Sequence, residues 1–257
     1  MNLIKKFEHL FRQINNIKKI NKRLTGKIKS CGIENSLPFI ELKTGEKFFG
    51  YPAKYYQKRM FFLFKKDIKH KLKNHRECIN ILYDINFRYL IPETETEIYD
   101  VGKYYKFSEG DIVLEIGAYI GMYAIRIAQK VGITGKIIAI EAMKNNYKIL
   151  KKNIHTNNIK NILPINKAIW HEQGMLQFYA TTKQANSAVS DFVDNEKVIN
   201  IESETIDSIV KNNNLSKIDF IRIQVNGAEK NALLGMDETF KLKPKLMVTV
   251  LHTDKSE

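Results

Sequence analysis

The second half of the chain alternates short apolar runs with amphipathic runs. From residue 111 onward, runs of buried-strand length are separated by stretches in which apolar residues recur every three or four positions, as on one face of a helix. The predicted strands cover residues 112–116, 136–140, 162–165, 220–225 and 246–251, and the predicted helices cover residues 122–130, 145–155, 206–212 and 229–234. Residues 175–179 are predicted to add an antiparallel strand. This alternation predicts an α/β fold with a mostly parallel sheet, flanked by helices and joined by right-handed crossovers.

Residues 1–100 follow a different pattern, which predicts an N-terminal helical and hairpin extension before a domain at residues 101–257. Residues 39–42 and 47–51 are two apolar runs around Thr44-Gly45, as in a β-hairpin. Residues 55–73, with an apolar centre between lysines, are predicted to form a helix packed on the sheet.

An apolar stripe at steps of three and four predicts a helix over residues 1–30. Its members are Leu3, Phe7, Leu10, Ile14, Ile17 and Leu24. Docking of the stripe on the domain is the favoured interpretation. A short coiled coil between two protomers of a homodimer, although Asn21 interrupts the stripe, and a basic helix on a membrane surface are the alternatives.

The composition is that of a globular protein, with 257 residues, 44% of them hydrophobic and 27% charged. Charged residues interrupt the N-terminal apolar residues, and no run approaches the roughly 20 apolar residues of a membrane span. We therefore expect no signal peptide, no transmembrane segment and a cytoplasmic location. Cys31 and Cys78 have neither metal-ligand nor C-x-x-C spacing, so we expect free thiols and no metal site.

The net charge of +14 is concentrated in the first part of the chain. Residues 1–110 hold 23 Lys and Arg against 12 Asp and Glu, whereas residues 111–257 hold 19 against 16. This asymmetry can signal an anionic partner, whether nucleic acid, a membrane surface or an acidic glycan. Nucleic acid is possible but not favoured, because Lys outnumbers Arg by 35 to 7 and no Arg-rich patch with interleaved aromatics is visible.

A glycine turn after the first predicted strand carries the candidate chemistry. Gly117 and Gly121 lie four positions apart, Glu115 precedes them, and Glu141 ends the next strand. In open α/β sheets such a turn lets backbone approach a nucleotide, and the acid on the next strand accepts hydrogen bonds from ribose hydroxyls. The third glycine of the dinucleotide pattern is missing. Because Glu115 would repel pyrophosphate and attract the amino group of a methionine moiety, S-adenosylmethionine fits better than NAD.

Several segments in this order resemble the FkbM-type S-adenosylmethionine-dependent methyltransferases. They are residues 114–121, 140–142, 153, 157–158, 163–168, 221–229 and 234–235. The resemblance implies a Rossmann-like class I methyltransferase fold, S-adenosylmethionine as methyl donor, and a hydroxyl on a small molecule or glycan as acceptor. The cofactor-binding residues that it implies are Glu115, Gly117, Ala118, Tyr119, Gly121, Glu141, Ala142, Asn166, Ala168 and Gln224.

The late strand departs from the family pattern. Where the family usually has Asp-Val-Glu-Gly, this chain has Gln224-Val225-Asn226-Gly227, and an amide has no useful basicity. Glu229 and His252 are the candidate replacements for a catalytic base. A helix-start charge and an exposed near-terminal histidine are the structural interpretations of these two residues.

Two alternatives to an active O-methyltransferase stay open. The loss of both late-strand acids is what a non-catalytic relative that still binds S-adenosylmethionine would show. The basic N-terminal region would suit an RNA methyltransferase, whose affinity for RNA falls steeply with salt.

Overall fold

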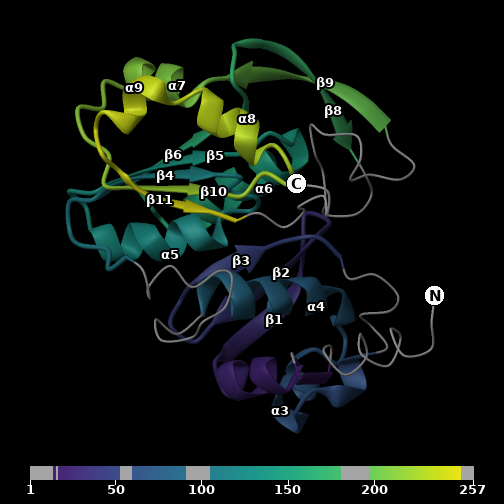
Figure 1. The fold of residues 1–257 in the computed structure, drawn as a ribbon. Helices are drawn as coiled ribbons and strands as arrows, with labels where there is room; N and C mark the ends of the chain where they lie inside the picture. The colour runs from purple at the N-terminus through teal and green to yellow at the C-terminus, as the bar shows by residue number, and fades with distance from the viewer. Residues whose placement is uncertain (1–13, 16, 53–59, 91–104, 181–196, 250–257) are drawn as a thin grey trace. The chain divides into compact units, whose positions relative to one another are not determined.

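The computed structural model describes residues 14–15, 17–52, 60–90, 105–180 and 197–249 (Figure 1). The chain divides into two compact units. The first comprises Met1–Pro92 with His155–Asn157, and the second comprises Glu93–Ile154 with Asn158–Glu257. The predicted domain boundary near residue 100 lies outside the described residues and stays a prediction.

The second unit is built on a five-stranded parallel sheet in the order β11-β10-β4-β5-β6. The strands are β4 (Ile112–Ile116), β5 (Lys136–Ile140), β6 (Ile162–Ile165), β10 (Phe220–Ile223) and β11 (Lys245–Val248). The predicted parallel sheet is therefore confirmed. Because β5 and β6 lie on one side of β4 and β10 and β11 on the other, the strand order reverses between β4 and β10, where open α/β sheets bind ligands.

Helices cover both faces of this sheet (Figure 1). They are α5 (Met122–Val131), α6 (Lys144–Thr156), α7 (Ile206–Asn212), α8 (Glu229–Leu234) and α9 (Asp237–Phe240). The first four agree with the prediction, whereas α9 was not predicted. In Figure 1, α5 lies on one face and α7, α8 and α9 lie on the other.

Alternation along the strands decides which side chains meet which helix. Leu114 and Ile116 of β4, and Ile221 and Ile223 of β10, belong to a buried cluster with side chains of α7 and α8. Every second residue of these strands therefore faces α5. The residues that face α5 include two charged ones, Glu115 of β4 and Arg222 of β10.

A small second sheet has the order β7-β9-β8. It contains β7 (Ala168–Ile169), β8 (Gly174–Ala180) and β9 (Lys197–Glu204). The predicted antiparallel strand is confirmed as β8, which pairs antiparallel with β9, a strand that was not predicted.

The first unit holds an antiparallel sheet of β1 (Ile28–Glu34), β2 (Leu37–Leu42) and β3 (Lys47–Phe49). The predicted hairpin is confirmed, since β2 and β3 pair with Phe39 opposite Phe49. Strand β1 was not predicted. Around the sheet lie η1 (Met60–Leu63), α3 (Lys66–Lys71), η2 (Arg76–Cys78), α4 (Ile79–Asp84) and the π-helical η3 (Ile85–Tyr89).

The single helix predicted over residues 55–73 is wrong in its described part, residues 60–73. It is interrupted at Lys65, whose extended backbone (φ −62°, ψ 157°) separates η1 from α3. Asn21 holds this break, because its Oδ1 accepts from the Lys65 backbone N–H at 2.8 Å and its Nδ2 donates to the Leu63 carbonyl at 3.0 Å. The polar residue that interrupts the apolar stripe thus bonds to the backbone of another segment.

Residues 14–15 and 17–24 are helical, as the predicted N-terminal helix requires. The prediction is wrong for residues 25–30, where a turn leads into β1 at Ile28. Ile17 is 1% exposed and Leu24 is 0% exposed, so this part of the stripe packs inside the chain. A homodimer through the N-terminal helix stays a prediction, because residues 1–13 lie outside the described part. Among the described residues, no helix has the length and apolar character needed to cross a membrane.

Candidate functional site

The glycine turn after β4 meets the backbone that follows β10. Gly117 has a φ of +86°, and a Cβ at this position would lie 2.0 Å from the Gln224 carbonyl oxygen. The N–H groups of Gly117 and Ala118 both donate to the Ile140 carbonyl at 2.9 Å. Glycine is therefore required at 117 by the fold itself, as the turn is fixed between the ends of β5 and β10.

The rest of the turn also has unusual backbone conformations. Gly121 has a φ of +84°, and a Cβ there would lie 2.3 Å from Leu150 Cδ1 on α6. Tyr119 adopts a φ of +54° without being glycine, a conformation that costs about 1–3 kcal/mol and is typical of functional turns. Its N–H donates to Glu141 Oε2 at 2.8 Å. The strained residue is thus bonded directly to the predicted ribose-binding acid.

Glu141 is a buried carboxylate at the carboxyl end of β5, with 7% of its surface exposed. Besides Tyr119, the Met143 N–H and Asn146 Nδ2 donate to Oε1 at 2.9 and 3.0 Å. Burial raises the pKa of Glu141 to about 7, although these three hydrogen bonds oppose the shift. Since a carboxylate offers about four acceptor positions, a ligand hydroxyl can use the remaining position or displace the Asn146 amide.

Glu115 forms a buried ion pair across the β4–β10 register. Arg222 Nη1 lies 2.5 Å from Glu115 Oε1, and the two side chains are 3% and 1% exposed. Arg222 also donates from Nη2 to Gln224 Oε1, and its guanidinium carbon lies 4.7 Å from the ring centroid of Tyr123 on α5. The negative charge of Glu115, which was predicted to attract a ligand amino group, is therefore shared with Arg222. Arginine has no acceptor atom, so the Gln224 carboxamide oxygen faces the guanidinium.

Asn166 joins the ends of β5 and β6. Its Nδ2 donates to the carbonyls of Glu141 at 2.8 Å and Ala142 at 2.9 Å. Ala168, which opens β7, is 4% exposed. Asn166 thus holds the backbone of two predicted cofactor residues in place.

Glu229 bonds to the turn that follows β10. Its Oε1 accepts from the Val225 N–H at 3.1 Å, and its Oε2 accepts from the Gly227 N–H at 2.8 Å. Within this turn Asn226 has a φ of +51°, a conformation that asparagine tolerates better than most residues. The carboxylate of Glu229 therefore fixes the turn that carries both amides. His252, the other candidate base, lies outside the described residues.

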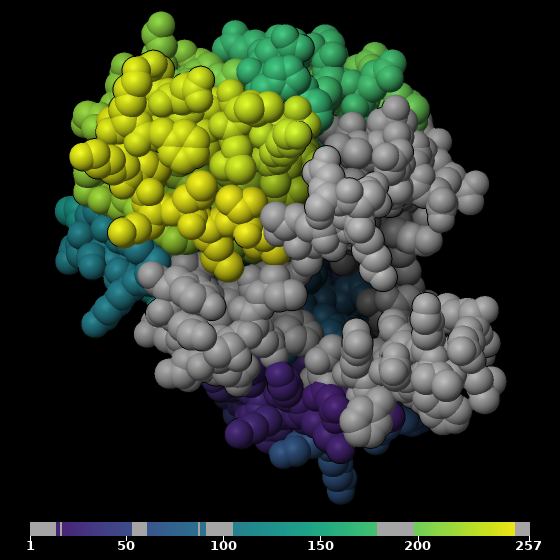
Figure 2. All heavy atoms as spheres, in the orientation of Figure 1, coloured from purple at the N-terminus to yellow at the C-terminus, as the bar shows by residue number. Residues whose placement is uncertain are grey.

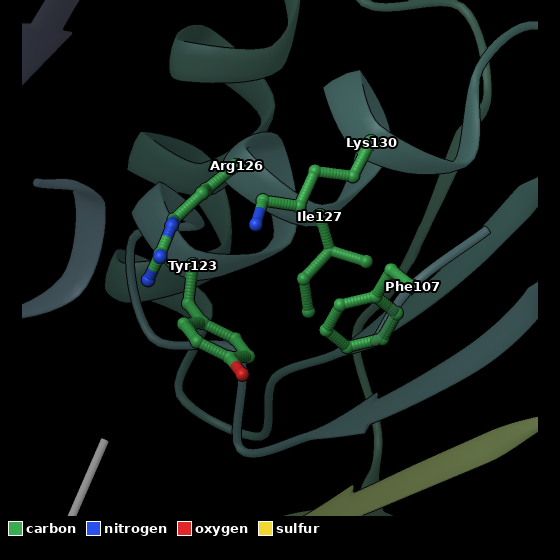
Figure 3. A pocket seen from close by; sticks show the side chains of 5 residues that line it. All are labelled: Phe107, Tyr123, Arg126, Ile127 and Lys130. Carbon is green, nitrogen blue, oxygen red and sulfur yellow. The ribbon is translucent and has the colours of Figure 1, made fainter. Parts of the chain in front are cut away.

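A shallow hollow opens beside α5 (Figure 3). Its lining is Phe107, Tyr123, Arg126, Ile127 and Lys130, none of which was predicted as a site residue. Tyr123 connects it to the Glu115–Arg222 pair, since the Tyr123 ring contacts the guanidinium. Within the described part of the chain, no group of three or more His, Cys, Asp or Glu side chains is arranged to hold a metal ion.

A sequence model of the methyltransferase FkbM domain matches residues 115–257, more than half of the chain. The chain belongs to the FkbM methyltransferase family. The match begins at Glu115 and contains every predicted site residue. A search of curated proteins found no match.

Several solved structures are similar to this FkbM family member. Methyltransferase FkbM from Methylobacillus flagellatus KT is 15% identical, with 94% of this chain and 49% of that chain covered and a TM-score of 0.45. An S-adenosylmethionine-dependent methyltransferase from Aquifex aeolicus is 16% identical, with 59% and 62% covered and a TM-score of 0.32. An O-methyltransferase from Bacillus cereus in complex with S-adenosylhomocysteine is 18% identical, with 51% and 44% covered and a TM-score of 0.32. The chain thus spans about half the length of the Methylobacillus protein.

The structure brings together the predicted residues at the ends of β4, β5 and β10, and it adds three that the sequence interpretation missed. Arg222 pairs with Glu115, Asn146 donates to Glu141, and Tyr123 packs against Arg222. A signal for Arg222 was available, because an arginine in a fully apolar strand requires a buried partner. The other two depend on where α5 and α6 begin relative to the strands.

Proposed function

We propose that this FkbM family member binds S-adenosylmethionine at the carboxyl ends of β4, β5 and β10 and methylates a hydroxyl on a small molecule or glycan. Family membership supports the reaction class. The observation that carries the cofactor assignment is Glu141, a buried acid bonded to the strained glycine turn and flanked by Asn166. An acid at this place in an open α/β sheet accepts hydrogen bonds from ribose hydroxyls.

In this proposal the three strand ends hold different parts of the cofactor. Glu141 binds the ribose, and the turn from Gly117 to Gly121 passes beneath the cofactor. Ala142, Asn166 and Ala168 form the side nearest the adenine. At the methionine end, Glu115 acts together with Arg222, which fixes the carboxamide of Gln224.

The bound cofactor supplies an electrophilic methyl group on a sulfonium. Positioning alone can lower such a barrier by roughly 7–11 kcal/mol. The chain's own contribution is therefore to hold the acceptor hydroxyl in line, and Glu229 serves this by fixing the turn of Gln224 and Asn226. His252 is the candidate to accept the hydroxyl proton.

The first test is calorimetric titration of the full chain with S-adenosylmethionine, S-adenosylhomocysteine and NAD. We expect micromolar binding of the first two and none of NAD. Glu141→Ala should weaken binding about tenfold or more, since it removes hydrogen bonds to a charged group worth roughly 1.5–3 kcal/mol. Glu172→Ala, whose side chain is 74% exposed, is the matched control and should bind as the parent does. Unchanged affinity in Glu141→Ala would remove the ribose assignment.

A non-catalytic S-adenosylmethionine-binding protein is the second candidate. It is favoured by the amides Gln224 and Asn226 and by the engagement of both Glu229 oxygens with backbone. Transfer of a labelled methyl group to a panel of sugars and small alcohols separates the two functions, with the double variant Gln224→Asp/Asn226→Glu run in parallel. Transfer by the parent chain supports the enzyme. Cofactor binding without transfer by either protein supports the second candidate.

A further inference from the structure

Two large apolar side chains lie next to each other at the surface of the first unit. In η1, Phe61 and Phe64 beside it are buried at 5% and 2% exposure, whereas Phe62 is 66% exposed and Leu63 is 44% exposed. The two flanking phenylalanines therefore anchor this segment, and the two residues between them present an aromatic and an aliphatic side chain to the surroundings.

Cationic side chains surround this apolar pair. Lys65 and Lys66 follow the buried Phe64 and are exposed. The guanidinium carbon of Arg76 lies 5.8 Å from the ring centroid of Phe62. The two hydrogen bonds of Asn21 hold helix 17–24 beside the same turn, and the exposed lysines of that helix extend the basic surface.

The charge of this surface is almost wholly of one sign. Residues 17–27 carry four Lys and no acid, besides Arg23, whose guanidinium bonds to the Asn86 carbonyl at 3.3 Å, and residues 62–76 carry six Lys and Arg and one acid, Asp67. The two segments are joined a second time where the Gly26 N–H donates to Asp67 Oδ2 at 2.9 Å. We call residues 17–27 and 62–76 together the basic face. Figure 2 shows the purple and blue side chains of this part of the chain at the molecular surface.

We propose that the basic face docks the protein on an anionic phospholipid membrane. Phe62 and Leu63 enter the boundary between headgroups and acyl chains, and the surrounding lysines contact lipid phosphates while their aliphatic stems lie along the apolar boundary. Complementarity of charge and apolar character argues for this occupant, because a membrane surface offers anionic phosphates directly above hydrocarbon. The proposal is independent of methyl transfer.

The chemistry of the pair favours a membrane over a nucleic acid. An aromatic ring can stack on a base, but the aliphatic side chain of Leu63 cannot. Leaving out Arg23, nine of the ten cations of the basic face are lysines, which are point charges without the planar fork that arginine offers to phosphates and bases. An aromatic and an aliphatic side chain surrounded by lysines therefore fit the hydrated surface of an anionic membrane.

The test is sedimentation of the full chain with phosphatidylcholine vesicles that contain or lack phosphatidylglycerol. We expect the chain to bind only the anionic vesicles, and we expect this binding to weaken at high salt. Phe62→Ser/Leu63→Ser and Lys65→Glu/Lys66→Glu should each lower vesicle partitioning about tenfold or more. The controls, which should bind normally, are Ile133→Ser, at a side chain 86% exposed in the second unit, and Lys148→Glu/Lys160→Glu.

A second measurement does not depend on loss of binding. Phe62→Trp should show a blue shift of the added tryptophan emission with anionic vesicles, and lipids brominated in the acyl chain should quench it. The proposal is overturned if the parent chain does not bind anionic vesicles, or if Phe62→Trp is not quenched. It is also overturned, in favour of a general polyanion site, if Phe62→Ser/Leu63→Ser binds vesicles normally while the lysine variant loses both vesicles and RNA.

Discussion

Glu141 is the residue at which burial and hydrogen bonding act in opposite directions. Its pKa is raised to about 7 by burial, so the folded chain holds a proton there that the unfolded chain releases near pH 4.5. The native state therefore binds more protons between these two values, and the free energy of unfolding must fall as pH rises through this window. The contribution of Glu141 is fully present below pH 4.5 and is lost as pH rises through about 7.

We expect this loss to amount to about 3 kcal/mol between pH 4.5 and pH 8. Urea unfolding of the parent chain and of Glu141→Gln at both pH values measures it, because the variant cannot titrate at this position. The stability of the parent relative to the variant should be lower at pH 8. A constant difference between pH 4.5 and pH 8 would show that folding does not raise the pKa of Glu141.

Cys31 and Cys78 lie far apart in sequence, and the fold brings their thiols together. A hydrogen bond from the Cys78 thiol, followed by the charge of Lys71, lowers the pKa of Cys31 against the effects of burial and Glu77. The same hydrogen bond, together with burial, raises the pKa of Cys78. Both remain free cysteines, as the sequence predicts.

The two thiols should therefore react at different rates, because the thiolate is the reactive form. With an aromatic disulfide reagent at neutral pH, we expect one fast thiol in the native chain and the second only after denaturation. Cys31→Ser should abolish the fast phase. Cys78→Ala should retain it at a reduced rate, because alanine cannot donate the hydrogen bond that lowers the Cys31 pKa. Two equal rates in the parent would contradict the assignment.

At the scale of elements, the Glu115–Arg222 pair joins β4 to β10 beneath α5. Removing one partner leaves a buried charge without compensation, which is typically worth about 3–5 kcal/mol, whereas replacing both can be nearly neutral. We expect Arg222→Met to lower the free energy of unfolding by about 3 kcal/mol or more, and Glu115→Gln/Arg222→Met to recover much of that loss. Denaturant unfolding of the parent, both single variants and the double variant completes the cycle. Additive losses would mean that the two charges are not coupled.

The elements that the sequence predicts correctly are those in which the local pattern of apolar residues determines which side chains are buried. The strands 112–116, 136–140 and 162–165 and the helix 206–212 match the structure because continuous apolar runs and apolar faces specify them. Helix 55–73 failed because Asn21, more than 40 residues away in sequence, bonds at Lys65. Strand β1 was missed because its alternation is interrupted, with Cys31 and Gly32 in its centre and a register shift near Ser30.

Part of the candidate site could likewise be predicted from local sequence, whereas the rest depends on the folded structure. Gly117, Gly121 and Glu141 could be located from spacing, since consecutive parallel strands end at one edge of the sheet. Sequence could not show that the Glu115 charge is shared with Arg222, nor that Glu229 bonds backwards to Val225 and Gly227, because both depend on strand register and on the turn after β10.

At the scale of the whole molecule, the two units are expected to respond differently to the cofactor. The Tyr119 and Met143 N–H groups donate to Glu141, at the proposed ribose position, whereas the strands of the first unit contain no predicted cofactor residue. A ligand that holds Glu141 should slow the opening of these hydrogen bonds. Hydrogen–deuterium exchange of the full chain with and without S-adenosylhomocysteine should therefore show slower exchange at residues 115–121 and 141–146 and no change at residues 28–42. Protection confined to the first unit would move the binding site away from the glycine turn. Protection spread evenly over both units would indicate global stabilisation and would give no support to a site at Glu141.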